Sequence, residues 1–148
     1  ETHNFSKILQ NAIELVQAKA MATSTKFEVS NKFNANVLCD ENKLLNIMIN
    51  LFYNALDSIE SAKTQGVIKI NTEETADNML KIYITDNGCG IEQDACEKIF
   101  EEGYTSKTTG SGLGLHISKE AMKEQYGDLN LVNSEKGSTT FVISLPKL

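Results

Sequence analysis

The chain has 148 residues, of which 41% are hydrophobic and 23% charged, which is the length and composition of one globular domain. Its formal net charge of -6 leaves no basic patch for a phosphate backbone, which argues against nucleic-acid binding. Any phosphate ligand must therefore be held by local groups.

The three cysteines and the N-terminal segment bear on the compartment. Cys39, Cys89 and Cys96 form neither an even disulfide framework nor a paired metal pattern, which favours a reducing environment. Residues 1–10 lack the basic, apolar and small-residue regions of a signal peptide, and no apolar run approaches the roughly 20 residues of a membrane span. We expect a cytoplasmic location without direct membrane contact, although the full-length protein could be membrane-anchored.

The first half of the chain predicts two helices and a hairpin. Apolar residues recur at helical spacing over residues 5–20 and again after Asp40, a natural N-cap, with the second pattern fading near Gly66. Two β-rich runs follow, at residues 67–72 and 80–85, and a polar connection joins them. They predict an antiparallel hairpin.

The second half predicts two more helices and two strands around a glycine-rich loop. A short helix is expected at residues 92–100, and residues 101–112, rich in Gly, Ser and Thr, predict a lid loop. The helical period returns over residues 113–126, and alternation returns at residues 128–133 and 139–145.

The predicted element order is α-β-α-β-β-α-α-β-β. Strands that arrive in adjacent pairs favour an α+β fold, a two-layer sandwich whose mixed, mostly antiparallel sheet is covered on one face by helices. No repeat or linker divides the chain, so we expect one domain over residues 1–148.

Strand parity singles out Asp86. Leu80, Ile82 and Ile84 alternate on one face, and Asp86 continues that face towards the apolar layer. An ionised carboxylate there needs a donor, supplied by the protein or by a ligand. The glycines in residues 86–91 allow close backbone approach, although Asp-Asn-Gly is also an ordinary turn former.

A stripe of amides follows the second helix. At spacings of four, four, four and three, its members are Asn42, Asn46, Asn50, Asn54 and Asp57. Asparagine is a poor helix former, so its repetition suggests ligands for a hard cation. A plain polar face is the other interpretation, and it is preferred for Asn42 and Asn46.

Residues 110–115 form a glycine-rich turn that runs into a helix. The free N–H groups and positive dipole end of such a helix can receive phosphate. The segment lacks the Gly-Lys-Ser/Thr ending of a P-loop, and a flexible hinge before a helix remains an alternative.

Together these segments resemble the nucleotide-binding domain shared by histidine kinases, gyrase-type topoisomerases, the heat-shock chaperone ATPase and mismatch-repair ATPases. Residues 50–58 look like the N box, and residues 86–91 and 110–115 match the two glycine boxes. Residues 100–107 resemble the F box and lid of histidine kinases, and residues 137–146 are similar to the closing strand. The resemblance implies a Bergerat-type ATP-binding fold, with ATP and Mg2+ as cofactors.

The resemblance also implies roles for individual residues. Asp86 would accept from the adenine amino group, Asn54 would ligate Mg2+, and Asn50 would be a second ligand or its support. Asp57 would shape the ribose and phosphate side. Lys107 would approach the terminal phosphate, or is only an exposed lysine. The other nucleotide contacts would come from Gly88, Gly90, Ile91, Phe100, Thr105, Ser106, Gly110, Ser111, Gly112, Leu113, Gly114, Leu115 and Thr139. Strand parity favours Thr139, which shares the face of Phe141, Ile143 and Leu145, and Thr140 is the alternative.

The N box favours a kinase over an ATPase. Hydrolytic relatives carry a glutamate where this chain has Asn50, and an amide cannot act as a general base. The expected chemistry is therefore phosphoryl transfer to a histidine elsewhere, with little activity in this fragment alone. Neither His3 nor His116 resembles a phosphoacceptor, so the partners implied are a separate phosphoacceptor histidine domain of the same protein and a downstream response regulator.

Two alternatives remain at this point. An anti-sigma-factor-type serine kinase has a similar fold, but its members resemble the glutamate-bearing N box. A non-catalytic module that binds nucleotide to switch a partner would share every motif. We expect the fragment to be monomeric, and the intact kinase to continue before Glu1.

Overall fold

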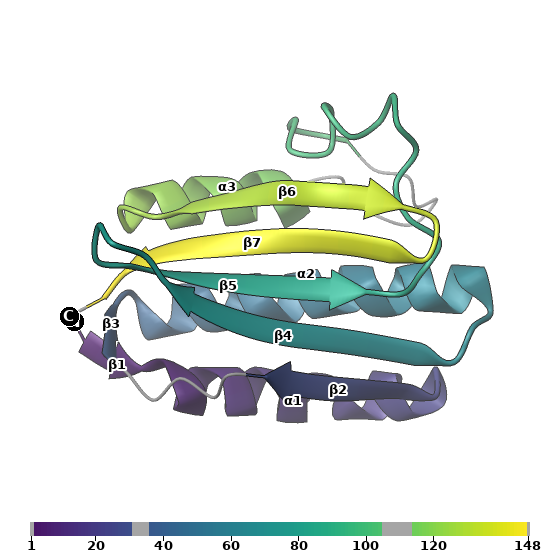
Figure 1. The fold of residues 1–148 in the computed structure, drawn as a ribbon, viewed down its shortest axis with the longest axis horizontal. Helices are drawn as coiled ribbons and strands as arrows, with labels where there is room; N and C mark the ends of the chain where they lie inside the picture. The colour runs from purple at the N-terminus through teal and green to yellow at the C-terminus, as the bar shows by residue number, and fades with distance from the viewer. Residues whose placement is uncertain (1, 31–35, 105–113, 148) are drawn as a thin grey trace.

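The computed structural model describes residues 2–30, 36–104 and 114–147. Figure 1 shows a sheet lying in front of the helices, so the described part of the chain forms two layers. The helices are α1 Phe5–Ala22, α2 Glu41–Ala62 and α3 Gly114–Glu124. The strands are β1 Thr2–Asn4, β2 Thr25–Ser30, β3 Asn36–Leu38, β4 Gly66–Glu74, β5 Met79–Asp86, β6 Asp128–Glu135 and β7 Ser138–Pro146. The predicted sandwich with helices on one face is confirmed.

The main sheet has five strands in the order β2-β4-β5-β7-β6. Only β2 and β4 run parallel, and the other three neighbouring pairs are antiparallel. Strands β4 and β5 form the predicted hairpin, with Ile70 opposite Ile84. The last strand, β7, lies beside β5 and brings Thr139 opposite Asp86.

Local capping and burial explain why the helices form where they do. The side chain of Asn4 accepts from the Lys7 N–H at 3.2 Å, and Asp40 accepts from the Lys43 N–H at 3.1 Å. The apolar faces of α1 and α2 then pack against the sheet, as in the edge contact of Phe52 with a β2 phenylalanine, Phe27, at 5.1 Å between ring centroids. This core fixes the position of α2 and of its polar stripe.

The predicted helix at residues 92–100 is wrong. The segment consists of turns, joined by isolated bonds such as Lys98 N–H to Ala95 O and Glu101 N–H to Lys98 O. Ile99 is its one fully buried apolar side chain, and the charged residues around it are exposed. So short a segment with so little apolar burial does not offset the cost of nucleating a helix.

A small second sheet was not predicted. Strands β1 and β3 pair antiparallel, with Thr2 opposite Leu38, and Val37 forms a bridge with Lys147. Three-residue strands are too short to show a period in the sequence.

Among the described residues, no helix is long and apolar enough to cross a bilayer.

Candidate functional site

Asp86 ends strand β5 with a buried side chain, as its parity predicted. It is 6% exposed, and its Oδ1 accepts from the Gly88 N–H at 2.9 Å. Burial raises the pKa of this carboxyl to about 6, although the Gly88 N–H acts in the opposite direction. A carboxylate held away from water with spare acceptor capacity is suited to a ligand that offers a hydrogen-bond donor.

The glycines after Asp86 let the loop of residues 86–91, here called the Asp86 loop, lie against its neighbours. A Cβ on Gly88 would come 2.7 Å from the Cβ of Ser58 on α2. Gly90 has φ +81°, and a Cβ there would lie 2.6 Å from the carbonyl oxygen of Glu135. Both positions therefore require glycine for close approach, and Gly90 also for its left-handed backbone.

Polar side chains anchor the same loop from both sides. Asn87 accepts from the Val67 N–H at 2.8 Å, and the Cys89 N–H donates to the Ser58 hydroxyl at 3.0 Å. The position of Asp86 is thus fixed by strand β4 and by helix α2. Ser58 lies within the N-box segment, but nothing in the sequence indicated that its hydroxyl anchors this loop.

Thr139 shares the face of Asp86. It is 3% exposed and hydrogen-bonds the Ser134 hydroxyl at 2.9 Å, and Ser134 in turn accepts from the Ile91 N–H at 2.8 Å. Thr140 instead pairs with the Thr85 hydroxyl at 2.8 Å on the other side of the sheet. The structure therefore brings Thr139, and not Thr140, to the side of Asp86.

On α2, Asn50 contacts the start of α3. Its Nδ2 donates to the Ser118 hydroxyl at 3.3 Å, and a Cβ on Gly114 would lie 2.7 Å from its Oδ1. Asn50 and Asn54 are half-buried, whereas Asn42 and Asn46 are exposed, as expected for a solvated polar face. The stripe thus divides into an exposed beginning and a half-buried end beside α3.

Asp57 forms an ion pair that the sequence did not predict. Its carboxylate contacts the ammonium group of Lys19 on α1, which lies 5.4 Å from the centroid of the Tyr53 ring. Lys19 occupies the last turn of α1, and no pattern in the sequence links it to α2. Only the packing of the two helices brings this pair together.

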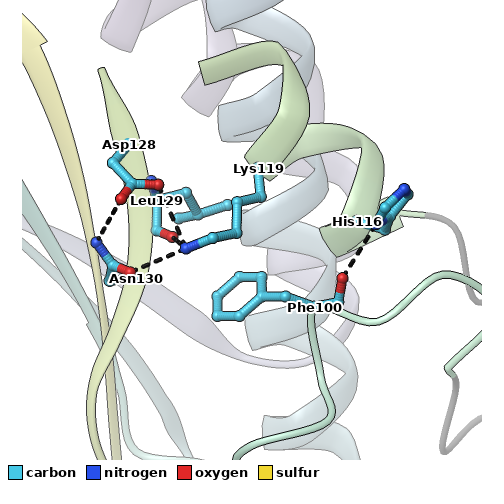
Figure 2. Close-up of polar contacts among 6 residues, drawn as sticks. All are labelled: Phe100, His116, Lys119, Asp128, Leu129 and Asn130. Carbon is cyan, nitrogen blue, oxygen red and sulfur yellow. Dashed lines mark hydrogen bonds and ion pairs between the residues drawn. The ribbon is translucent and has the colours of Figure 1, made fainter. Parts of the chain in front are cut away.

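Figure 2 shows how Phe100 is held beneath α3. The ammonium of Lys119 lies 4.7 Å from the Phe100 ring centroid and donates to Leu129 O at 2.7 Å and Asn130 Oδ1 at 2.9 Å. It also pairs with Asp128 at 3.3 Å. Burial acts to raise the pKa of Asp128, but hydrogen bonds from Leu129, Asn130 and Lys119, with the Lys119 charge, hold it below its usual value.

The Phe100 backbone and ring have further protein partners. His116 Nδ1 lies 3.1 Å from the Phe100 carbonyl oxygen, so this nitrogen carries the proton that it donates. His116 Nε2 lies 3.7 Å from Glu102, and the Phe100 ring meets Phe141 edge-on at 6.2 Å. Phe100 was predicted to contact the nucleotide, and the structure shows it packed among protein groups.

Several predicted contacts lie outside the described residues, and they stay predictions. They are Thr105, Ser106, Lys107, Gly110, Ser111, Gly112 and Leu113, together with most of the predicted lid over residues 101–112. Of the second glycine box, Gly114 opens α3 with an exposed position, and Leu115 packs against the core.

A family model covers this fold and this site. Residues 39–148 match the model described as "Histidine kinase-, DNA gyrase B-, and HSP90-like ATPase". The match covers more than half of the chain and includes α2, the Asp86 loop and α3. The chain belongs to this family of ATPase domains.

The curated relatives that the chain matches include sensor proteins. Sensor protein FixL of Bradyrhizobium diazoefficiens is 29% identical over 144 residues, 97% of this chain and 28% of that protein. C4-dicarboxylate transport sensor protein DctB of Rhizobium meliloti is 40% identical over 105 residues, 71% of this chain and 16% of that protein. The chain therefore spans less than a third of the length of these curated relatives.

Solved structures agree on the fold. The catalytic domain of histidine kinase ThkA superposes with a TM-score of 0.84 at 26% identity, covering 99% of this chain and 95% of that one. The mycobacterial sensor histidine kinase MprB superposes with a TM-score of 0.84 at 22% identity, covering 99% of this chain and 98% of that one. At this identity the likeness shows the fold alone. The chain has the fold of a histidine kinase catalytic domain.

Proposed function

We propose that the chain binds Mg-ATP and positions its terminal phosphoryl group for transfer to a histidine on a separate domain, within a two-component signalling kinase. The observation that carries the proposal is Asp86, a buried carboxylate with a raised pKa at the end of β5, in a chain of the ATPase family. In this proposal, residues 1–148 act as one cytoplasmic catalytic domain.

Asp86 would select adenine through its acceptor oxygens. Above its pKa of about 6 the carboxylate is ionised and can accept from an exocyclic amino group. Guanine presents a carbonyl oxygen at the corresponding edge, and two acceptors facing each other in a buried site repel. Thr139, Ser134 and Ile91 form a hydrogen-bonded chain on the same side that would orient the base.

The α2 stripe would hold the magnesium ion. Amide oxygens are hard ligands of the kind Mg2+ accepts, and Asn54 and Asn50 are half-buried on one side of α2. Because the Asn50 Nδ2 donates to Ser118, its Oδ1 is the atom left for a cation. The bound ion would neutralise part of the phosphate charge.

The phosphates would lie at the start of α3. Gly114 packs on Asn50, so the N-terminal end of this helix lies beside the proposed metal ligands. Backbone N–H groups at a helix N-terminus favour anions. The predicted contribution of Gly110, Ser111, Gly112, Leu113 and Lys107 belongs to the same proposal.

The transfer step needs a histidine from outside this chain. The position of the general base in hydrolytic relatives is occupied here by the amide Asn50, so water would be activated poorly. His116 is bonded to the Phe100 carbonyl and His3 pairs with Glu41 at 3.5 Å. A phosphoacceptor domain of the same protein would supply the attacking nitrogen, and a response regulator would then receive the phosphoryl group.

Phosphoryl transfer in trans tests this function. The chain would be mixed with labelled ATP, Mg2+ and a separately purified histidine phosphoacceptor domain of a sensor kinase, with Asp94→Asn, an exposed carboxylate, as the matched control for Asp86→Asn. We expect acid-labile labelling of the acceptor by the wild type and by Asp94→Asn, and none with Asp86→Asn. Rapid phosphate release without labelling would contradict the kinase assignment.

A further inference from the structure

Asp57 brings a negative charge to the proposed phosphate side of the site. It follows Asn54 by three residues on α2, so the two side chains project from the same side of the helix. The next residue, Ser58, contacts Gly88 and accepts from the Cys89 N–H of the Asp86 loop. Asp57 therefore lies between a proposed metal ligand and the proposed base-binding loop.

An uncompensated carboxylate in this place would oppose a triphosphate. ATP carries several negative charges, and like charges a few ångströms apart repel most strongly where water is partly excluded. Asp57 is 31% exposed, so solvent screens its charge only in part. A site that places Asp57 here needs a cation beside it.

Lys19 supplies that cation from helix α1. Its ammonium contacts the Asp57 carboxylate, and the Lys19 side chain is 33% exposed. The Tyr53 ring, at 5.4 Å, provides a second attractive partner that limits where the ammonium can lie. Residue 19 precedes the region of the family match, residues 39–148, so the match assigns it nothing.

We propose that Lys19 is a positioning residue of the nucleotide site, whose ammonium compensates Asp57 and so permits a carboxylate beside the phosphates of ATP. The inference rests on the proposed binding of Mg-ATP by this chain. If the ion pair only joined α1 to α2, replacing Lys19 would lower stability, and any change in ligand affinity would not depend on the phosphates.

The test measures the affinity of Mg-ATP, Mg-ADP and adenosine for Lys19→Met, Lys19→Arg and Lys19→Met/Asp57→Asn. Lys26→Met is the matched control, because it removes the same charge from an exposed position on β2. Circular dichroism and the midpoint of thermal unfolding establish that each variant is folded.

We expect Lys19→Met to weaken ATP about tenfold, as for one partly screened unit charge near a polyphosphate, and adenosine by less than about twofold. Lys19→Arg and Lys26→Met should stay within about twofold of the wild type for both ligands. Removing the second charge, in Lys19→Met/Asp57→Asn, should restore most of the ATP affinity, and added salt should shrink the Lys19→Met effect.

Equal losses for ATP and adenosine, or no loss of ATP affinity in folded Lys19→Met, would overturn the inference while leaving the proposed function intact. So would a selective ATP loss that Asp57→Asn does not repair, since Lys19 would then act on the phosphates directly. A wild-type chain that binds no ATP would overturn the proposed function and this inference with it.

Discussion

The Asp86 loop and the half-buried end of the α2 stripe, at Asn50, Asn54 and Asp57, form two sides of the proposed site with different environments. Asp86 is almost fully buried at the end of β5, and its carboxylate accepts a hydrogen bond from the Gly88 backbone N–H. On α2, Asn50 and Asp57 are half-buried and contact side chains from other helices, Ser118 and Lys19. In the proposed site, specificity for a base would therefore rest on one desolvated group, and phosphate binding on several partly screened ones.

This difference predicts that protonation affects the two sides unequally. Burial raises the pKa of Asp86 from 3.8 to about 6. Because the folded state then binds the proton more tightly than the unfolded state, Asp86 costs stability above pH 6, and that cost disappears as the pH falls towards 4. The stability of the wild type relative to Asp86→Asn should rise by about 2 kcal/mol between about pH 7 and pH 4, towards a limit of about 3 kcal/mol at lower pH.

Urea unfolding of both proteins across this pH range measures the effect. ATP affinity should show the opposite trend and weaken as the pH falls through about 6, because the ionised carboxylate accepts from the adenine amine more strongly than the neutral acid does. A stability difference that is independent of pH would show that Asp86 is solvated in the folded protein.

A second comparison separates close packing from backbone conformation in the Asp86 loop. Gly90 and Gly137 both have positive φ, +81° and +90°, but a Cβ meets the Glu135 backbone only at Gly90. We expect Gly90→Ala to destabilise the fold by about 2–3 kcal/mol and Gly137→Ala by about 1 kcal/mol, measured by urea unfolding. Equal losses would mean that the loop does not pack on Glu135.

The smallest effect is expected beneath α3. Lys119→Met would leave the Leu129 carbonyl without its ammonium donor and remove the Asp128 pair, at a cost of about 1–2 kcal/mol in unfolding free energy. Lys123→Met, exposed one turn later on the same helix, should change stability by less than about 0.5 kcal/mol. If both variants unfold alike, the Lys119 contacts drawn in Figure 2 contribute nothing to stability.

Much of the Asp86 side could be predicted from the sequence. Strand alternation has a period of two, so the parity of Leu80, Ile82 and Ile84 fixed the face of Asp86, and the same rule favoured Thr139 over Thr140. The hairpin and the two long helices followed from apolar periodicity. These features depend on residues that are close in the chain.

The remaining features depend on packing between distant elements. The ion pair of Lys19 and Asp57 joins two helices, and the Lys119 side chain extends from α3 to β6. Neither contact leaves a pattern in the sequence. The ring contacts of Phe100 with Lys119 and Phe141 likewise join separate elements, and its assignment to the nucleotide by resemblance stays a prediction. The helix predicted at residues 92–100 does not form, because the segment buries too little apolar surface to offset the cost of nucleating a helix.

Calorimetric titration of ATP and GTP with Mg2+ into the wild type and Asp86→Asn tests the central claim most directly. We predict that the wild type binds ATP and not GTP, and that Asp86→Asn loses at least about 30-fold in ATP affinity, the value of a buried hydrogen bond to a charged group. Equal affinity for the two nucleotides, or a folded Asp86→Asn variant that binds ATP as the wild type does, would contradict the account.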